Sequence, residues 1–365
     1  MRVRAVTSED EFIALEPYWN ELLLDSCLPH VQSTFEWLYT WWKHFGEDAS
    51  LFILVAEDEA GIAGIAPLVI HKVGKFYNNL MKFKRLSFLG VGFTDHADFI
   101  IQRNRDEVVK LFFRFIYQHK NKWDEINLRQ VNSESPQYPL LQNGMLEKVL
   151  PINDELKKSF SMLIMVPYVE IGGSFQDYLN LLSSQFKKQL QRYIRSIQTL
   201  GELRFEALDE MDERTMEGIL KINRERNSET GRRSILLDKR KFAFICEVLP
   251  KLSSKGWLKV FVLKLDEEII TYEITFSFNN IIYAWNTSFS LEYSKYSPGR
   301  IIVYEIIKYC YENGYKKFDL MVGAEEYKFK WTQKITNNYV FAIKKNNLKT
   351  SFSEFYEKLK YQFKE

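Results

Sequence analysis

The stretch Tyr293–Trp331 reads YSKYSPGRIIVYEIIKYCYENGYKKFDLMVGAEEYKFKW. Its pattern predicts a turn, a helix with apolar residues at helical spacing, a stop at Asn313-Gly314 and a short strand over residues 317–322. A helix start leaves backbone N–H groups without internal partners and carries partial positive charge. No acid occupies the first helical turn, so the start suits a phosphate or pyrophosphate, although an ordinary strand-to-helix turn has the same pattern. The residues of this start are Ser297, Pro298, Gly299, Arg300 and Ile301.

The order of these features resembles the acetyltransferases of the CelD/BcsL type, which have a GNAT-like fold and are related to the FemAB peptidyltransferases. The resemblance rests on SPG, FDL, a glycine and YK..W in that order, with Trp285 and Tyr293 upstream. It implies an α+β fold of tandem duplicated GNAT-like acyltransferase domains, with mixed, mostly antiparallel sheets flanked by helices. It also implies acyl-CoA, in particular acetyl-CoA, as the co-substrate, bound at residues 297–301.

An internal repeat supports the duplication independently of the resemblance. Phe52–Ile70 parallels Phe261–Phe278, and Val108–Val131 parallels Ile301–Gly323. Each half therefore predicts an antiparallel hairpin, then a helix, then a neighbouring strand. We expect a first domain over residues 1–165, a second over 166–365, and an active cleft between them. The tail, residues 351–363, has the pattern of an amphipathic helix.

The repeat also predicts which half binds the nucleotide. The first-half helix starts Asn104-Arg105-Asp106-Glu107. Two acids in a first turn stabilise the helix through its dipole, but they repel a pyrophosphate. The second half offers Ser297–Arg300 without an acid, so we assign the acyl-CoA site to the second domain.

Composition narrows the class of protein. The chain has 365 residues, 46% of them hydrophobic, and a net charge of +2. A near-neutral charge gives no global bias toward DNA. Three cysteines stand far apart without zinc spacing, so we expect no metal site and a reducing, cytoplasmic setting. The N-terminus lacks the apolar region of a signal peptide, and no segment predicts direct membrane insertion.

Two groups of residues are candidate general bases for direct attack of an acceptor on an acyl donor, because no nucleophile–His–acid motif is present. The first group is Asp95, His96 and Asp98, where two acids flank a histidine after a strand; a polar turn is the alternative. The second is Glu273, a lone charge within the apolar strand expected over 269–278. A carboxylate there is costly unless it is paired or faces a cleft, or else it faces solvent.

Further residues are candidates for substrate binding. The resemblance assigns this role to the FDL and YK..W positions and to the upstream aromatics, and a structural salt bridge is the alternative for the charged ones. A third candidate is the basic segment Gln185–Arg195, which lacks acids and suits a CoA phosphate, tRNA or simply solvent. The substrate-binding candidates are Tyr293, Trp285, Asp319, Tyr327, Lys328 and Trp331, with Lys330 as a further cation.

The sequence therefore predicts an N- or O-acyltransferase acting on a small-molecule or saccharide acceptor. From the resemblance alone, the reaction belongs to exopolysaccharide or cell-envelope synthesis. Two alternatives remain: an aminoacyl-tRNA-dependent transferase of the FemAB kind, the only reading with tRNA as a partner, and a non-catalytic scaffold of a polysaccharide-synthesis complex.

Overall fold

The chain folds into two compact units. A computed structural model describes residues 1–73, 83–152, 155–231 and 233–346. The first unit comprises Met1–Ile164 and the segment from Asn337 onward, and the second comprises Met165–Thr336. Assigning the whole chain after residue 165 to the second domain is wrong at its end, because β15 (Ile335–Lys345) pairs antiparallel with β8 (Glu125–Asn132) of the first unit. The helix expected over residues 351–363 lies outside the described residues.

The first unit contains two sheets. One has the order β1-β3-β4-β7, and the other runs β15-β8-β6-β5-β2, with β6 and β8 parallel. Helix α4 packs on β1, β3 and β4 and buries its apolar side in the core of this unit. The remaining bounds are β1 Arg2–Val6, α1 Glu9–Ile13, α2 Glu16–Leu24, α3 Phe35–Phe45, β2 Ala49–Leu51, β3 Ile53–Asp58, β4 Gly61–Ala66, β5 Leu68–Val73, β6 Phe83–Phe88, β7 Ile100–Ile101, α4 Arg105–Gln118, α5 Tyr138–Gln142 and β9 Leu156–Glu170.

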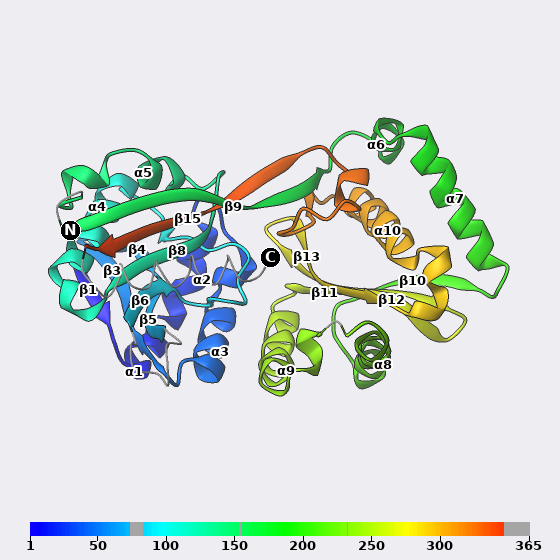
Figure 1. Cartoon of the computed structure of the whole chain (residues 1–365), viewed down its shortest axis with the longest axis horizontal. Coiled ribbons are helices and arrows are strands. Elements are labelled where there is room, and N and C mark those ends of the chain that lie inside the picture. The colour runs from blue at the N-terminus through cyan, green and yellow to red at the C-terminus, as the bar shows by residue number, and fades with distance from the viewer. Residues whose placement is uncertain (74–82, 153–154, 232, 347–365) are drawn as a thin grey trace. The chain divides into compact units, whose positions relative to one another are not determined.

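The second unit is one sheet with helices on both faces (Figure 1). Its strands follow the order β10-β11-β12-β13-β14, and the end of β9 pairs with β14; only the β13–β14 pair is parallel. Helices α8 and α9 cover one face, and α7 and α10 cover the other. The bounds are α6 Phe175–Leu181, α7 Ser184–Gln198, β10 Leu203–Leu208, α8 Glu213–Thr230, α9 Lys239–Ser254, β11 Leu258–Leu265, β12 Glu268–Phe278, β13 Ile281–Phe289, α10 Pro298–Glu312 and β14 Lys317–Asp319.

The two units share the predicted order of elements. Helix α4 leads to β8, which is parallel to β6, and α10 leads to β14, which is parallel to β13. The residues that cap the two helices, Asn104 and Ser297, are both left-handed, with φ 51° in each case. The predicted α+β fold with mixed sheets flanked by helices is therefore confirmed.

Helix α10 is fixed by its apolar side. Ile301, Ile302, Ile306 and Ile307 are fully buried against the sheet and α7. Burial of each such side chain contributes about 1.5–3 kcal/mol. The start of α10 is thus held rigidly beside the end of β13. Among the described residues, no helix combines the length and the apolar character that a membrane span requires.

Candidate functional site

The strands β13 and β14 diverge after a short parallel contact. They pair only from Ile281 to Tyr283 on β13, which face residues 317–319 on β14. β13 continues to Phe289, whereas β14 ends at Asp319, three residues earlier than predicted. It ends there because the Asp319 carboxylate accepts the N–H of Met321 at 2.8 Å, and Met321 takes a left-handed conformation with φ 58°. Beyond Tyr283, this edge of β13 pairs with no other strand in the described part of the chain.

A β-bulge lies at the start of the unpaired edge. On β12, Ile274 faces Asn286, but the next residue, Thr275, faces Ala284. Trp285 is therefore the extra residue of the bulge, and its ring packs against Phe276 at 5.3 Å. A bulge locally bends a strand and re-aims its side chains. The sequence-predicted Trp285 thus lies where the two strands begin to separate.

The start of α10 follows this edge. Ser297 makes no side-chain cap, and no acid occupies the first turn, so the helix start keeps its positive potential. A Cβ built on Gly299 would meet only Phe289, at an ordinary contact distance of 3.5 Å. The last residue of β13 and the first turn of α10 are therefore neighbours, and a Cβ at Gly299 would fit between them.

Helix α7 adds polar groups beside this start. The Arg300 guanidinium donates to the Gln189 side-chain oxygen at 3.3 Å and lies 5.9 Å from the Tyr193 ring. The pKa of the Tyr193 hydroxyl is lowered, first by a hydrogen bond with Ser297 and then by the charges of Arg300 and Arg192. Two cations, Arg300 of α10 and Arg192 of α7, therefore lie close enough to the Tyr193 hydroxyl to favour its charged form.

The outer side of α7 is basic and exposed. Lys188, Arg192 and Arg195 are exposed, whereas Phe186 and Leu190 are buried against the unit. The helix contains no acid between residues 184 and 198. The predicted basic segment therefore carries three exposed cations at helical spacing on α7, the helix that contacts Arg300.

Glu273 is buried beside the unpaired edge. It is 4% exposed and faces Phe261 on β11 and Thr287 on β13. Phe261 contacts Tyr309 of α10, which places the carboxyl on the α10 face of the sheet. Burial raises the pKa of Glu273 to about 7, opposed by a hydrogen bond with Thr287 and by the charge of Lys328. Thr287 itself is exposed, so a carboxyl that titrates near neutrality lies one side chain from solvent.

Lys328 is held in place by contacts within the chain. Its ammonium donates to the carbonyl oxygens of Met321 (3.2 Å) and Val322 (2.8 Å), and it lies 3.0 Å from a Glu325 carboxylate oxygen. The side chain is only 4% exposed. The predicted contact with substrate phosphate or carboxylate thus competes with three internal partners. Its charge instead acts on Glu273, whose pKa it lowers.

Two other FDL and YK..W positions are also engaged internally. Asp319 binds the Met321 N–H and lies 3.5 Å from the Lys317 ammonium. Trp331 is 1% exposed and packs edge-on against Phe186 at 4.9 Å. Trp331 also lines a groove of 850 Å³ between α6, the start of α7 and the segment 329–334. These contacts hold the segment after β14 against the second unit.

The remaining predicted substrate-binding residues are more accessible. Tyr327 is 39% exposed, and Lys330 pairs with Glu326 at 3.0 Å. Tyr293 lies on a 3₁₀ helix, Leu291–Tyr296, and its hydroxyl donates to Glu268 at 3.3 Å. Tyr293 therefore lies between β13 and α10, close in sequence to the helix start.

Asp95 and His96 belong to a buried polar network of the first unit. The Asp95 N–H donates to the Gln32 side-chain oxygen at 2.8 Å, and the Asn338 amide donates to the Asp95 carbonyl oxygen at 2.6 Å. The His96 ring lies 4.4 Å from the His30 ring, and both histidines are buried. Partners far apart in sequence thus hold this loop in place, whereas the alternative interpretation was an ordinary polar turn.

Asp98 lies at the edge of the same network. One carboxylate oxygen accepts the Phe99 N–H at 2.8 Å and the other accepts the Ser135 hydroxyl at 2.5 Å. Burial nevertheless raises the pKa of Asp98 to about 7, opposed by these hydrogen bonds and by the charge of Arg105. The three predicted residues are therefore brought together, but in the first unit, whereas Glu273 lies in the second.

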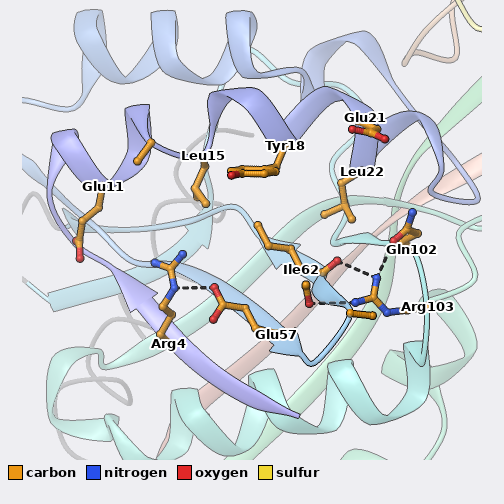
Figure 2. A pocket seen from close by; sticks show the side chains of 13 residues that line it. Arg4, Glu11, Leu15, Tyr18, Glu21, Leu22, Glu57, Ile62, Gln102 and Arg103 are labelled. Atoms are coloured by element: carbon orange, nitrogen blue, oxygen red, sulfur yellow. Dashed lines mark hydrogen bonds and ion pairs between the residues drawn. The ribbon is translucent and has the colours of Figure 1, made fainter.

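A separate groove of 630 Å³ crosses the first unit (Figure 2). Both of its arginines are paired: Arg4 binds Glu57 of the groove at 2.8 Å, and Arg103 binds Asp58 outside the lining at 2.7 Å. Arg103 also donates to the carbonyl oxygens of Gly61 and Ile62 at the start of β4. This groove contains none of the predicted site residues. Within the described residues, no cluster of three or more metal-ligating side chains has the geometry to hold an ion.

The polar residues of β13 were missed by the sequence reasoning. Asn286 and Thr287 follow the bulge, and Asn286 accepts a hydrogen bond from the buried Tyr272 at 2.8 Å. The signal was present in the letters N-T-S after Trp285, in a strand that is otherwise apolar and aromatic. Such letters also fit a solvent-facing hairpin, so sequence alone did not distinguish the two cases.

Comparison with known proteins shows which family the second unit resembles. Residues 184–329 match the family model described as an acetyltransferase (GNAT) domain. This part of the chain is therefore similar to GNAT-type acetyltransferase domains. No curated protein sequence matches the chain.

Solved structures extend the likeness to nearly the whole chain. FemX is 12% identical, with 93% of this chain and 97% of FemX covered and a TM-score of 0.64. A conserved protein of unknown function from Bacteroides thetaiotaomicron is 11% identical, with 93% and 100% covered and a TM-score of 0.58. The C-terminal domain of a putative lysylphosphatidylglycerol synthetase from Agrobacterium fabrum is 13% identical, with 94% of each covered and a TM-score of 0.50. At these identities the likeness shows the fold alone.

Proposed function

We propose that the chain is an acyltransferase that moves an acyl group, most simply acetyl, from acyl-CoA to an amine or hydroxyl acceptor. The observation that carries this proposal is the divergence of β13 from β14 directly beside the acid-free start of α10. An extended pantetheine arm needs unpaired strand backbone, and a pyrophosphate needs free N–H groups and positive charge. Within the segment that matches the GNAT domain, the chain offers the unpaired edge of β13, the N–H of Gly299, which has no backbone acceptor among the described residues, and the charge of Arg300.

The proposed roles follow from these positions. The start of α10, residues 297–301, binds the pyrophosphate, with Arg300 and the basic surface of α7 adding charge. The edge of β13 from Ala284 to Phe289 binds the pantetheine arm. In the transfer step, the acceptor nitrogen or oxygen bonds to the thioester carbon and the C–S bond breaks. Glu273 receives the acceptor proton, and the sulfur leaves with the electron pair.

A carboxyl with a pKa of about 7 is suited to this task. It is ionised in about half of the molecules at neutral pH and is basic enough to accept a proton. Burial supplies the raised pKa and outweighs the opposing hydrogen bond with Thr287. A saccharide acceptor in exopolysaccharide or cell-envelope synthesis is the acceptor class that the resemblance to CelD-type proteins suggests, and it remains part of this proposal.

Aminoacyl-tRNA is the second candidate donor, because the acid-free outer side of α7 suits a polyanion. The two donors differ in salt dependence. Binding of tRNA falls steeply with salt because many phosphates are neutralised, whereas acyl-CoA carries few phosphates. A noncatalytic scaffold would bind neither.

The test is calorimetric titration of acetyl-CoA into the wild type and two variants, Gly299→Glu and Gly299→Gln. A Cβ at Gly299 makes only an ordinary contact, and both Glu and Gln favour a helix more than Gly does, so both variants should fold. We expect the Glu variant to bind at least about tenfold more weakly through repulsion of the pyrophosphate, and the Gln variant to remain within a few-fold of the wild type.

Two results would count against the proposal. Equal binding by the Glu variant would remove the α10 start from the site. A folded wild type that binds no acyl-CoA would reject the acyl-CoA reading, and a parallel titration of aminoacyl-tRNA at two salt concentrations would then decide between the transferase and the scaffold.

A further inference from the structure

A buried hydrogen-bond chain runs through the α8 face of the second unit. The Asn223 side-chain amide nitrogen on α8 donates to the Ile219 carbonyl oxygen at 2.8 Å and to the Tyr272 hydroxyl at 2.7 Å. The Tyr272 hydroxyl donates to the side-chain oxygen of Asn286 on β13 at 2.8 Å. Asn223 is 5% exposed and Tyr272 is fully buried. These hydrogen bonds therefore link helix α8, the central strand β12 and the unpaired edge of β13.

The chemistry of the three side chains decides which group donates and which accepts in each of these hydrogen bonds. A primary amide nitrogen has two hydrogens, and Asn223 uses one for each partner. Rotating that amide by 180° would place its oxygen against the Ile219 carbonyl oxygen, which is also an acceptor. The hydroxyl of Tyr272 thus receives a hydrogen bond from Asn223 and gives its own hydrogen to Asn286. A buried hydroxyl hydrogen needs an acceptor, so the oxygen of the Asn286 amide faces Tyr272.

It follows that the nitrogen of Asn286 faces away from Tyr272. This nitrogen carries two N–H donors, and it has no hydrogen-bond partner among the described residues. Asn286 is half-buried and directly follows the bulge residue Trp285. The structure thus holds an oriented pair of donors at the point where β13 loses its strand partner.

The donors and the proposed base lie on opposite faces of the sheet. Asn286 faces Ile274 across the ladder and shares the α8 face with Tyr272. Glu273 and Thr287 alternate with these residues and lie on the α10 face. An acyl group at the unpaired edge would have a hydrogen-bond donor on one side and a proton acceptor on the other.

We propose that Asn286 donates its side-chain N–H to the carbonyl oxygen of the acyl thioester, and that Tyr272 and Asn223 are positioning residues that hold the amide in this orientation. The inference rests on the proposed function, because it requires an acyl donor at β13. As the acceptor attacks, negative charge develops on that oxygen, and a donor already aimed at it stabilises the transition state more than the ground state. Removal of one such donor typically lowers kcat about 10²–10³-fold.

The test reads the carbonyl itself. Acetyl-CoA labelled with ¹³C at the acetyl carbonyl is bound to the wild type and to the Asn286→Ala, Asn286→Asp and Tyr272→Phe variants, and its C=O stretch is recorded by isotope-edited infrared spectroscopy. Calorimetry gives the affinity in the same samples. Asn286→Asp keeps the size and the acceptor for Tyr272 but removes both donors, and Tyr272→Phe keeps Asn286 but releases its orientation.

We expect the wild type to shift the bound carbonyl to lower frequency than in free acetyl-CoA, and both Asn286 variants to abolish the shift. Tyr272→Phe should broaden and reduce it. A shift that survives in both Asn286 variants, or a bound wild-type carbonyl with the free frequency, would overturn the inference and leave the acyl-CoA site standing. A folded wild type that binds no acetyl-CoA would reject the proposed function, and the inference would fall with it. If Tyr272→Phe does not fold, the Asn286→Ala variant still tests whether Asn286 donates to the acyl carbonyl oxygen.

Discussion

Replacing Glu273 by Gln should make the second unit more stable, and the gain should grow with pH. In the folded chain the pKa of Glu273 is raised from the usual 4.5 to about 7. Below pH 4.5 the carboxyl is protonated in both states and contributes nothing. Between pH 4.5 and 7 the unfolded chain releases this proton while the folded chain keeps it, so stability falls as the pH rises. Above pH 7 the loss is complete.

The size of the effect follows from the two pKa values. A difference of about 2.5 in pKa corresponds to about 3 kcal/mol at full effect. Integration over the titration gives a wild-type loss of about 1.4 kcal/mol at pH 5.5 and about 3 kcal/mol at pH 8. Gln keeps the shape of the protonated acid and does not titrate. The stability of Glu273→Gln relative to the wild type should therefore increase by about 2 kcal/mol between these two pH values.

The assay must report on the second unit, because the two units need not unfold together. Hydrogen exchange of peptides that cover β12, measured at pH 5.5 and pH 8 and corrected for the intrinsic rate, gives the local opening free energy. Asp98→Asn is the matched control. The pKa of Asp98 is also raised to about 7, but this residue lies in the first unit and its substitution should leave β12 unchanged.

One result would refute the reasoning. If Glu273→Gln changes the opening free energy of β12 equally at pH 5.5 and pH 8, the carboxyl does not titrate between the folded and unfolded states as described. The base role would then lose its physical ground, because a carboxyl with an ordinary pKa has no special affinity for a proton at neutral pH.

Three further predictions concern other parts of the fold. Lys328→Met should cost about 2–3 kcal/mol, because two buried carbonyl oxygens lose their donor, and it should raise the pKa of Glu273 further; urea unfolding and the β12 exchange profile measure the two effects. Asn338→Ala should cost about 2–4 kcal/mol in urea unfolding, since this fully buried amide donates to two oxygens of the first-unit network. Burial raises the pKa of the Cys310 thiol, so Ellman's reagent should titrate only two thiols in the folded chain, Cys27 and Cys246.

Local pattern was sufficient to predict most elements of the fold. The helical spacing after Gly299 and the alternation over 269–278 correspond to α10 and β12. The end of β14 was not predictable in this way, because the Asp319 carboxylate takes a backbone N–H that a longer strand would have used. The assignment of β15 also failed, because its partner β8 is about 200 residues away and no local signal identifies a distant strand.

The candidate site shows the same limit. Glu273 was detectable because a charge in an apolar strand violates the expected pattern. Asn286 and Thr287 were not, because polar residues on a strand are ordinary unless one knows that the strand edge is unpaired. Whether an edge is paired depends on where β14 ends, and that depends on the side chain of Asp319.

The starts of α4 and α10 share one backbone conformation but differ in charge. Asn104 and Ser297 cap α4 and α10 with nearly the same left-handed conformation and without a side-chain hydrogen bond to the helix start. The geometry therefore does not distinguish the two units, and the difference lies in charge. Asp106 and Glu107 neutralise the potential at the start of α4, whereas the first turn of α10 contains Arg300 and no acid. An acidic substitution at Gly299 would cancel the charge of Arg300 in the first turn of α10, which is why that single change is the most direct test of which unit binds the anion.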